Sequence, residues 1–505
     1  MSGRSLGVAD IKLQKKNEVY NVVTTEPHIH RELSEYFTFE VPEAKFMPLY
    51  RNKVWDGKIR LYSPGNGEIY GGLTEHLIQW CKTMRYTMEY EENKYFGLPD
   101  ETNDEITLSG IRTFMQGITK FEPRIYQIQG VYEALKYNRK LLLSPTASGK
   151  SLMVYGIARF HVAMKRRVLL IVPTTSLVEQ MYKDFEEYGW NASKHCHKVY
   201  AGRDKYVDSN VIITTWQSIY KEPRKWFEQF DCVIGDEAHL FKSKSLTKIM
   251  TKLHGCKYRV GFTGTLDGTL THKWILEGLF GPCEQLVKTK DLMEGGYLTP
   301  LKVKCLVLKH EWGTFDSYHD EIDYLITHTK RNNLIKNLCL DVSGNTLVLF
   351  NYVERHGEPL YELINNSTER KVFFVHGGVD VEDREEVRRI TETETDAIII
   401  ASYGTFSTGI NIKKLHNVIF ASPSKSRIRN LQSIGRVLRK SKDKHVATLY
   451  DIADDITRGE WKNFTYKHFE ERLKIYHEEK FIMRLSKYVP SFSLCKTHYK
   501  TRLSG

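Results

Sequence analysis

Short apolar runs recur along the chain from about residue 120 onward. Each run holds four to six residues and ends in small or polar residues, and a stretch with helical periodicity follows it. Runs that are apolar at every position are typical of strands buried on both faces of a parallel sheet. We therefore predict alternating strands and helices, beginning with strands at Leu141–Ser144, Val168–Pro173, Val211–Thr215, Cys232–Gly235 and Tyr258–Gly261.

A second series of apolar runs has the same character. Two successive α/β blocks of about 150 residues each indicate two lobes of one architecture. Ligands of open parallel sheets bind beyond the carboxyl ends of the strands, so functional residues are expected there. The strands of the second series are predicted at Thr346–Phe350, Val372–Val375, Ala397–Ala401, Val418–Ala421 and Val446–Tyr450.

The two ends of the chain differ from this pattern. Near the N-terminus, Val19–Thr25 and Phe37–Val41 read as strands and Leu73–Met84 as a helix, which predicts a small α+β unit. The polar segment Asp100–Gly110 is a candidate linker. The C-terminal tail begins with apolar residues at helical spacing, which predicts a helix with one packing face; these residues are Phe469, Leu473 and Tyr476.

The predicted fold class is therefore α/β, with two tandem parallel-sheet lobes. An α+β domain spans residues 1–100, the first lobe 111–297 and the second lobe 298–456, and a helical extension spans 457–505. No stretch reaches the roughly 18 uninterrupted apolar residues of a membrane span. The first sixteen residues also lack the apolar core of a signal peptide. These observations predict a cytoplasmic protein without membrane association.

Composition narrows the choice of partner. The 505 residues carry a net charge of +12, and 41% of them are hydrophobic. A basic surplus favours polyanions, because each neutralised phosphate releases counterions; simple solubility is the alternative explanation. None of the eight cysteines is paired at a C-x-x-C spacing. A zinc site is therefore not expected, and a reducing compartment is.

A phosphate-binding loop is predicted at Ser144–Ser151, between a strand and a helix. Gly149 allows close backbone approach, and helix N-terminal N–H groups attract phosphate. Lys150 would contact the β- and γ-phosphates, and the Ser151 hydroxyl would ligate Mg²⁺. The segment departs from the G-x-x-x-x-G-K-[ST] pattern, because Ser144 replaces the first glycine. The other loop residues predicted to contact ATP are Thr146, Ala147 and Ser148.

A second predicted element of the site is the pair of carboxylates that ends the run Cys232–Gly235. Two unpaired carboxylates after a buried strand are costly, and a cation removes that cost. Asp236 is predicted to hold Mg²⁺, and Glu237 to orient the attacking water and accept its proton. His239 either couples this site to the next strand or serves only a structural role.

Upstream of the loop, two polar residues are candidates for contact with adenine. The Gln127 amide has both a donor and an acceptor for the base edge, and the Arg124 guanidinium can stack on the ring. In the second lobe, helical spacing places Gln432, Gly435, Arg436 and Arg439 on one predicted helix face.

Taken together, these residues resemble the motifs of superfamily 2 helicases of the DEAH/DExH type, over about residues 120–455. The resemblance implies two RecA-like lobes that use ATP and Mg²⁺. It identifies Arg124, Tyr126 and Gln127 with the Q motif, and Asp236–His239 with motif II. It also implies that Gly261–Thr265 couples hydrolysis to movement. The lobe-one residues that would hold a nucleic-acid backbone are Pro173, Thr174 and Thr215.

In lobe two, Ser402–Ile412 resembles motif V, with Thr408 as a nucleic-acid contact. The usual Gly-x-Asp of that motif is replaced by Gly409-Ile410-Asn411. Gln432–Arg439 matches the Q-x-x-G-R-x-x-R pattern of motif VI. The resemblance implies that Gln432, Arg436 and Arg439 serve catalysis, with Arg439 as the arginine that stabilises transition-state charge.

The sequence resembles more closely the UvsW recombination-repair helicases of T-even-type phages. Trp55–Leu61 in the N-terminal unit carries this resemblance, together with Ala401–Ile412 and Ile434–Lys440 in lobe two. It implies ATP-dependent unwinding of branched DNA or RNA–DNA hybrids, and a DNA-binding N-terminal domain. Trp55, Lys58 and Arg60 either form a platform for stacking on DNA or belong to a hairpin with an Asp-Gly turn and a buried tryptophan.

We thus expect a monomer that acts on branched or single-stranded DNA without sequence preference, because backbone contacts carry little sequence information. Three alternatives remain at this stage. DExH motors also include RNA helicases, and the motifs do not reveal 2′-OH contacts. A double-strand translocase that does not separate strands would use the same motifs. A degenerate binding scaffold is the non-enzymatic alternative, and the intact predicted catalytic residues argue against it.

Overall fold

The protein forms two compact units. The first holds the described residues as far as Leu286, apart from Pro145–Ser148; the second holds Pro145–Ser148 and the described residues from Val287 onward. No helix among the residues described is long and apolar enough to cross a membrane. The computed structural model describes residues 9–41, 44–91, 94–98, 101–200, 202–311, 313, 315–409, 412, 414–441, 444–457 and 459–488.

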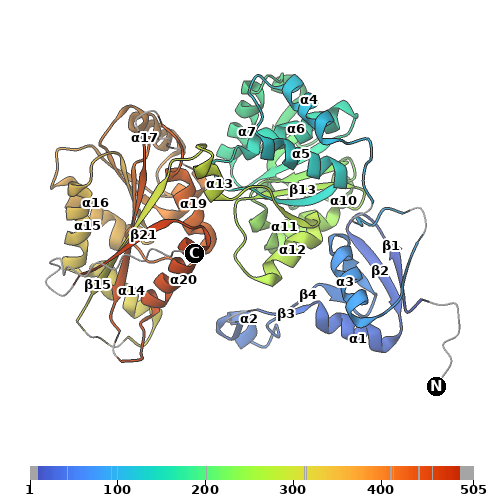
Figure 1. Cartoon of the computed structure of the whole chain (residues 1–505), viewed down its shortest axis with the longest axis horizontal. Helices are drawn as coiled ribbons and strands as arrows, with labels where there is room; N and C mark the ends of the chain where they lie inside the picture. The colour runs from blue at the N-terminus through green and yellow to red at the C-terminus, as the bar shows by residue number, and fades with distance from the viewer. Residues whose placement is uncertain are drawn as a thin grey trace. The chain divides into compact units, whose positions relative to one another are not determined.

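The N-terminal domain is built on a five-stranded sheet of order β5-β6-β2-β1-β7. Only β1 and β7 run parallel, whereas the other neighbours are antiparallel, as expected for an α+β unit. Helices α1 (Pro27–Tyr36) and α3 (Thr74–Met84) lie beside this sheet (Figure 1). The strands are β1 (Ile11–Lys15), β2 (Tyr20–Thr25), β5 (Tyr62–Ser63), β6 (Glu68–Tyr70) and β7 (Met88–Tyr90).

A two-stranded arm belongs to the same domain. Strands β3 (Thr38–Glu40) and β4 (Lys58–Arg60) pair antiparallel. A 3-10 turn, η1 (Ala44–Phe46), and the short helix α2 (Pro48–Arg51) lie between them in the chain. Of the two alternatives for Trp55–Arg60, the tight hairpin at Asp56-Gly57 is contradicted. Gly57 has a φ of +80° but only precedes β4, because the inserted turn and helix separate the two strands.

The first lobe contains seven parallel strands in the order β10-β11-β9-β12-β13-β8-β14. All five strands predicted for this lobe are present. Every residue of β9, β11 and β12 is buried, which explains their continuous apolar sequence. The strands are β8 (Arg139–Leu143), β9 (Val168–Val172), β10 (Cys196–Val199), β11 (Val211–Thr215), β12 (Cys232–Gly235), β13 (Tyr258–Thr263) and β14 (Cys283–Gln285).

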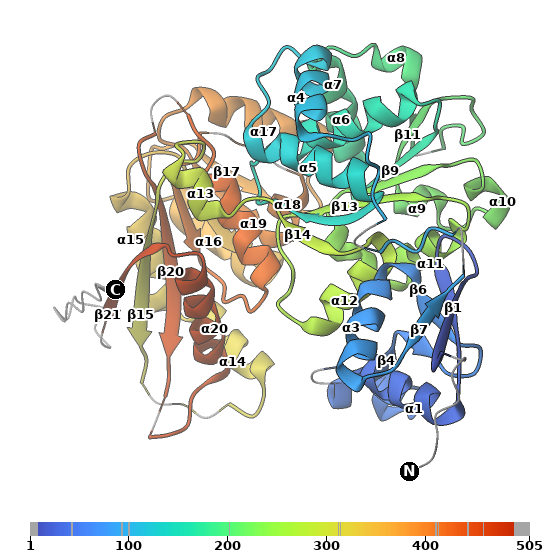
Figure 2. The same ribbon diagram turned by 45° about the vertical axis from the view of Figure 1, so that its right-hand side comes forward.

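Helices cover both faces of this sheet (Figure 2). One core forms beneath α4, α5, α6 and α7, and a second beneath α9 to α12 on the other face. The helices are α4 (Leu108–Ile118), α5 (Ile125–Tyr137), α6 (Lys150–Ala163), α7 (Thr175–Glu187), α8 (Ala192–His195), α9 (Trp216–Ile219), α10 (Arg224–Phe227), η3 (Ala238–Lys242), α11 (Lys244–Lys252) and α12 (Leu270–Phe280).

Helix α12 joins the N-terminal domain to this lobe. The Trp274 ring lies 5.5 Å from the rings of Tyr36 and Phe37, measured between centroids. One turn further along α12, the Glu277 carboxylate lies 2.8 Å from His76 Nε2 of α3. These contacts bury aromatic surface from both sides, so the N-terminal domain and the first lobe pack as one body.

The second lobe repeats the parallel architecture, with seven strands in the order β17-β18-β16-β19-β20-β15-β21. The five strands predicted here are again present. The strands are β15 (Leu301–Lys309), β16 (Thr346–Phe350), β17 (Val372–Val375), β18 (Ile398–Ser402), β19 (Asn417–Phe420), β20 (Ala447–Asp455) and β21 (Ile482–Tyr488).

Helices α15 and α16 pack on one core of this sheet. The helices of the second unit are α13 (Thr289–Glu294), α14 (Tyr318–Thr327), α15 (Thr329–Asp341), a π-helical turn η4 (Val353–Gly357), α16 (Glu358–Asn365), α17 (Val381–Thr393), α18 (Tyr403–Gly409), α19 (Arg427–Val437) and α20 (Phe464–Glu478).

The C-terminal tail begins with the predicted helix and continues into a strand that the sequence did not predict. Helix α20 contains Phe469 and Tyr476, both fully buried. Its Arg472 guanidinium lies 2.8 Å from each carboxylate oxygen of the buried Asp451 in β20. Strand β21 then pairs with β15 and completes the sheet. The tail as far as Tyr488 is thus part of lobe two, and residues 489–505 lie outside the described chain.

Candidate nucleotide and nucleic-acid sites

The predicted phosphate loop connects β8 to α6. The Ser144 N–H donates to the Thr263 carbonyl at 2.9 Å, which anchors the start of the loop to β13. The Ser148 hydroxyl donates to the Pro145 carbonyl at 2.7 Å and closes a tight turn. Ala147 has a φ of +67°, a conformation that is strained for a residue with a side chain. The loop is therefore compact and held in one shape before α6 begins.

Gly149 is the N-cap of α6 and has a φ of +81° and a ψ of 42°. A Cβ atom at this position would lie 2.5 Å from Gln127 Nε2, the mobile end of a flexible side chain, so it is the positive φ that requires glycine here. The Lys150 ammonium donates to the Ser144 carbonyl at 3.2 Å. Lys150 thus lies over its own loop, where a phosphate oxygen can replace the carbonyl as its acceptor.

Gln127 connects the upstream polar segment with the phosphate loop. Its amide oxygen accepts the Arg124 N–H at 2.9 Å and so caps α5, and its amide nitrogen donates to the Gly149 carbonyl at 3.3 Å. The Arg124 guanidinium donates to the Tyr126 hydroxyl at 2.7 Å. Contact of Arg124 and Gln127 with adenine stays a prediction. The hydrogen bond with Gly149 also ties the start of α5 to the end of the phosphate loop.

Asp236 follows β12 and is almost fully buried, with 9% of its surface exposed. Burial, and next the charge of Glu237, raise the pKa of Asp236 to about 6, while the Lys150 ammonium lowers it. The Asp236 Oδ1 atom is buried and lacks a hydrogen-bond partner. A buried carboxylate oxygen without a donor is the environment that a divalent cation satisfies. The assignment of the Ser151 hydroxyl as a second ligand of that cation stays a prediction.

Glu237 has a φ of 50° and a ψ of 51°, so its backbone is in the left-handed region. Strain of this kind at a non-glycine residue persists where the surrounding structure requires it, as it often does at functional sites. His239 Nδ1 lies 3.2 Å from Glu237 Oε2 and 3.0 Å from Thr263 Oγ1. Of the two roles left open for His239, the geometry favours coupling, because Thr263 ends β13 within the predicted motif III.

The lobe-one residues predicted to contact nucleic acid follow neighbouring strands. Pro173 and Thr174 come directly after β9, and Thr215 ends β11, which pairs parallel with β9. The Thr174 hydroxyl accepts the Leu177 N–H at 3.3 Å and caps α7. Thr215 is buried and its hydroxyl lies 3.0 Å from the Ser218 hydroxyl. The three residues therefore share one edge of the sheet, with Pro173 and Thr174 the more exposed.

In the second unit, Gln432 and Arg436 lie within α19, as predicted. The prediction that Arg439 belongs to the same helix is wrong, because α19 ends at Val437 and Leu438 is its C-cap. The Leu438 side chain is fully buried, and its carbonyl accepts the Thr299 N–H at 2.8 Å. This contact with the start of the lobe turns the chain out of the helix. The Arg436 guanidinium lies 5.4 Å from the Phe406 ring centroid.

Motif V is described only in part. Helix α18 includes Thr408, but the Thr408 side chain and residues 410–411 lie outside the described structure. The prediction that Thr408 contacts nucleic acid therefore stays a prediction.

The arm of the N-terminal domain carries the remaining predicted residues. Lys58 Nζ lies 3.7 Å from Glu40 Oε1, and the Arg60 guanidinium pairs with the Asp56 carboxylate. The Trp55 indole N–H donates to the Lys58 carbonyl at 2.8 Å, and its ring is partly exposed. The arm thus presents a charged surface with an accessible tryptophan, although both predicted cations already have acidic partners.

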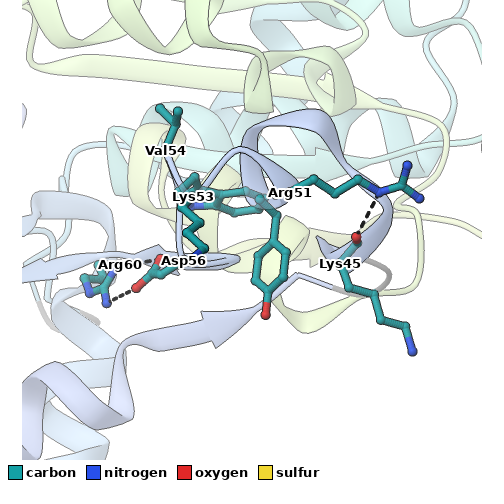
Figure 3. A pocket seen from close by; sticks show the side chains of 8 residues that line it. Lys45, Arg51, Lys53, Val54, Asp56 and Arg60 are labelled. Atoms are coloured by element: carbon teal, nitrogen blue, oxygen red, sulfur yellow. Dashed lines mark hydrogen bonds and ion pairs between the residues drawn. The ribbon is translucent and has the colours of Figure 1, made fainter.

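A shallow hollow in this arm holds further cations that the sequence analysis overlooked (Figure 3). The hollow has a volume of about 890 Å³. Lys45, Arg51 and Lys53 line it together with Arg60, and Tyr50 and Trp55 supply aromatic surface. The signal was present in the sequence as basic and aromatic residues interleaved between positions 45 and 60, but only the structure brings them to one hollow.

The fold and these motifs define a superfamily 2 helicase. Residues 120–268 match the family model of the res subunit of type III restriction enzymes, and residues 329–441 match the helicase conserved C-terminal domain. Residues 10–91 match the model described as DNA helicase UvsW, N-terminal. Together the three models account for the N-terminal domain and both lobes.

The chain is similar along almost its whole length to a characterised helicase. It is 34% identical over 497 residues to the ATP-dependent DNA helicase UvsW of Enterobacteria phage T4, with 94% of this chain and 98% of that protein covered. The protein therefore belongs to the UvsW helicase family. The crystal structure of T4 UvsW matches with a TM-score of 0.50 at 30% identity, covering 95% of this chain and 99% of that one.

A more distant relative covers the helicase core. The DNA 3'-5' translocase XPB2 of Sulfurisphaera tokodaii is 24% identical over 427 residues, which cover 76% of this chain and 93% of that protein.

Proposed function

We propose that the protein is an ATP-dependent DNA helicase that unwinds or branch-migrates branched DNA, including recombination junctions, stalled forks and RNA–DNA hybrids. The observation that carries the ATP-driven part is the first-lobe site, where Lys150, the buried Asp236 and the strained Glu237 meet beyond the carboxyl ends of parallel strands. Membership of the UvsW family supports DNA as the polymer. Action as a monomer in the host cytoplasm stays a prediction.

ATP binding is assigned to the first lobe. Loop N–H groups from Thr146 to Ser148 cradle the phosphates together with Gly149, and Lys150 leaves the Ser144 carbonyl to contact the β- and γ-phosphates. Ser151 and Asp236 hold Mg²⁺ in this assignment, in agreement with the unsatisfied Asp236 Oδ1. When bound, Mg²⁺ neutralises charge on the phosphate oxygens. Arg124 and Gln127 contact the adenine.

Hydrolysis requires a base for the attacking water. Glu237 orients that water and accepts its proton, while His239 links the movement of Glu237 to β13. Gln432, Arg436 and Arg439 are assigned to the γ-phosphate as transition-state charge develops. Loss of the γ-phosphate removes the contact with these arginines and Gln432. The protein then moves along the DNA through backbone contacts, which do not read the sequence. These contacts are assigned to Pro173, Thr174, Thr215 and Thr408.

The function is tested by comparing the full chain on several substrates. We expect ATP hydrolysis to be stimulated by DNA, and strand displacement or branch migration to be faster on forks, four-way junctions and RNA–DNA hybrids than on blunt duplex. If only RNA stimulates ATP hydrolysis, the protein is an RNA helicase instead. If it displaces a third strand from a triplex without separating the duplex, it is a double-strand translocase.

The arm of the N-terminal domain is proposed as a DNA contact. Four cations and two aromatic side chains line one open hollow, which combines charge for phosphates with surface for stacking on exposed bases (Figure 3). Lys58 and Arg60 are included in this contact. Their pairing with Glu40 and Asp56 indicates that they contribute less than Arg51 and Lys53, because part of their charge is already neutralised.

Removing two of these charges is expected to weaken binding in a salt-dependent way. For the double variant Arg51→Gln/Lys53→Gln in the full chain, we expect about tenfold weaker binding of forked DNA at low salt. The magnitude of the slope of log affinity against log salt should fall by about two, because each lost phosphate contact lowers that magnitude by about one. Fluorescence anisotropy across a salt series measures both quantities.

The matched control is Lys12→Gln/Lys82→Gln, which removes two exposed charges from the same domain. An equal change of slope in the control would assign the effect to net charge rather than to the hollow. An unchanged slope in the Arg51/Lys53 variant would rule out the arm as a phosphate contact.

A further inference from the structure

Ser151, the last residue of the predicted phosphate loop, has a hydrogen-bond partner outside the helicase motifs. The Ser151 Oγ atom lies 2.6 Å from the Tyr188 hydroxyl oxygen. Tyr188 is the C-cap of α7, far from Ser151 in the sequence, and α7 begins after Thr174, one of the proposed nucleic-acid contacts. Helix α7 is about 20 Å long, at 1.5 Å per residue. It therefore has Thr174, a proposed nucleic-acid contact, at its start, and Tyr188, which touches the proposed Mg²⁺ ligand, at its end.

The Tyr188 ring is held firmly in this place. Its centroid lies 5.2 Å from the Tyr155 ring with an interplanar angle of 61°, and 5.7 Å from the Phe121 ring at 87°. Both arrangements are edge-to-face contacts, which are favourable for aromatic pairs. The oxygen that faces Ser151 is thus held in position by these ring contacts.

The chemistry of a serine hydroxyl gives this contact a direction. The group has one proton to donate and two lone pairs to offer. If Ser151 offers a lone pair to a cation, its O–H group points away from the cation and needs a hydrogen-bond acceptor there. The Tyr188 oxygen lies at the right distance to accept that hydrogen bond. Partners of metal ligands commonly orient the ligand in this way.

We propose that Tyr188 is a positioning residue whose hydroxyl oxygen accepts a hydrogen bond from the Ser151 hydroxyl and thereby directs a Ser151 lone pair toward the nucleotide-bound divalent cation. The inference rests on the proposed function, since it needs Ser151 as a ligand. Tyr188 itself touches neither nucleotide nor cation. The unsatisfied oxygen of the buried Asp236 is the second, independent indication that a cation belongs at this site.

The test measures how much Mg²⁺ strengthens nucleotide binding. The affinity of the full chain for a fluorescent ADP analogue is determined with Mg²⁺ and with EDTA, and the ratio of the two affinities is the readout. Tyr188→Phe keeps the ring and its contacts with Tyr155 and Phe121 but removes the acceptor. We expect the ratio to fall about tenfold, the lower end of what the loss of a metal ligand's partner costs, with the EDTA affinity unchanged.

Two further variants separate the possible outcomes. Tyr182→Phe, on the same helix with its ring against Lys198, should leave the ratio unchanged. Ser151→Ala should lower the ratio at least as far as Tyr188→Phe does. If Ser151→Ala lowers the ratio but Tyr188→Phe does not, the role of Tyr188 is refuted while the proposed function stands. If neither lowers it, the assignment of Ser151 to Mg²⁺ fails as well.

Discussion

ATP turnover is expected to fall about a thousandfold when Glu237 is replaced by Gln, while ATP still binds. Glutamine has nearly the shape of glutamate, so the strained backbone at this position and the contact with His239 remain possible. The amide cannot accept a proton from the attacking water, and general-base catalysis typically contributes 10²–10⁴-fold. Steady-state phosphate release gives the turnover, and equilibrium binding of a fluorescent ATP analogue gives the affinity.

The isosteric control is Glu228→Gln at the C-cap of α10, where the side chain is exposed and pairs with Arg224 one turn earlier. This variant should hydrolyse ATP at the rate of the unmodified protein. DNA should still bind to Glu237→Gln, because the nucleic-acid residues lie after other strands. Normal turnover in Glu237→Gln would refute the assignment of Glu237 as the base, and loss of ATP binding would indicate a structural role instead.

Replacement of Arg439 by Ala is expected to lower the rate constant for hydrolysis by about 10³-fold or more, with little change in ATP affinity. An arginine that contacts the γ-phosphate as charge develops contributes about 10³–10⁵-fold in related enzymes. Arg439 lies beyond the end of α19, where the chain is turned by the Leu438–Thr299 hydrogen bond. Its position therefore depends on the lobe rather than on helix periodicity. Single-turnover hydrolysis at saturating DNA measures the rate constant.

Two companion variants test this assignment. Arg427→Ala removes an arginine of α19 that pairs with Glu478, and it should leave the rate almost unchanged. Arg436→Ala should have a smaller effect than Arg439→Ala. A larger effect of Arg436→Ala would indicate that Arg436, rather than Arg439, stabilises the transition-state charge. If both replacements leave the rate unchanged, the assignment of motif VI to catalysis is wrong.

Most strands of both lobes were predictable because burial on two faces leaves an uninterrupted apolar run, as in β9 and β11. Strand β21 was not predicted because its sequence lacks such an uninterrupted apolar run. It lies at the edge of the sheet beside β15, and polar residues such as Arg484 and Lys487 interrupt its apolar pattern. Such a strand is stabilised by its pairing, which a local pattern does not reveal.

The candidate catalytic residues were inferred from short-range spacing, and their roles stay predictions. A loop followed by Lys150 and Ser151 at the start of a helix, and a strand followed by Asp236 and Glu237, have few other chemical uses. Helical spacing, however, led to a wrong expectation for Arg439. Periodicity describes a helix only while the helix lasts, and α19 is ended by a contact with Thr299, a residue distant in the chain.

Residue order was therefore enough to predict the two lobes, the candidate phosphate loop and the two carboxylates that follow β12, because each depends on neighbours within a few turns or strands. The raised pKa of Asp236, the Tyr188–Ser151 hydrogen bond and the cationic hollow of the arm depend on atoms brought together from distant segments. Burial and hydrogen bonding are properties of position in space. Only the packed structure sets them.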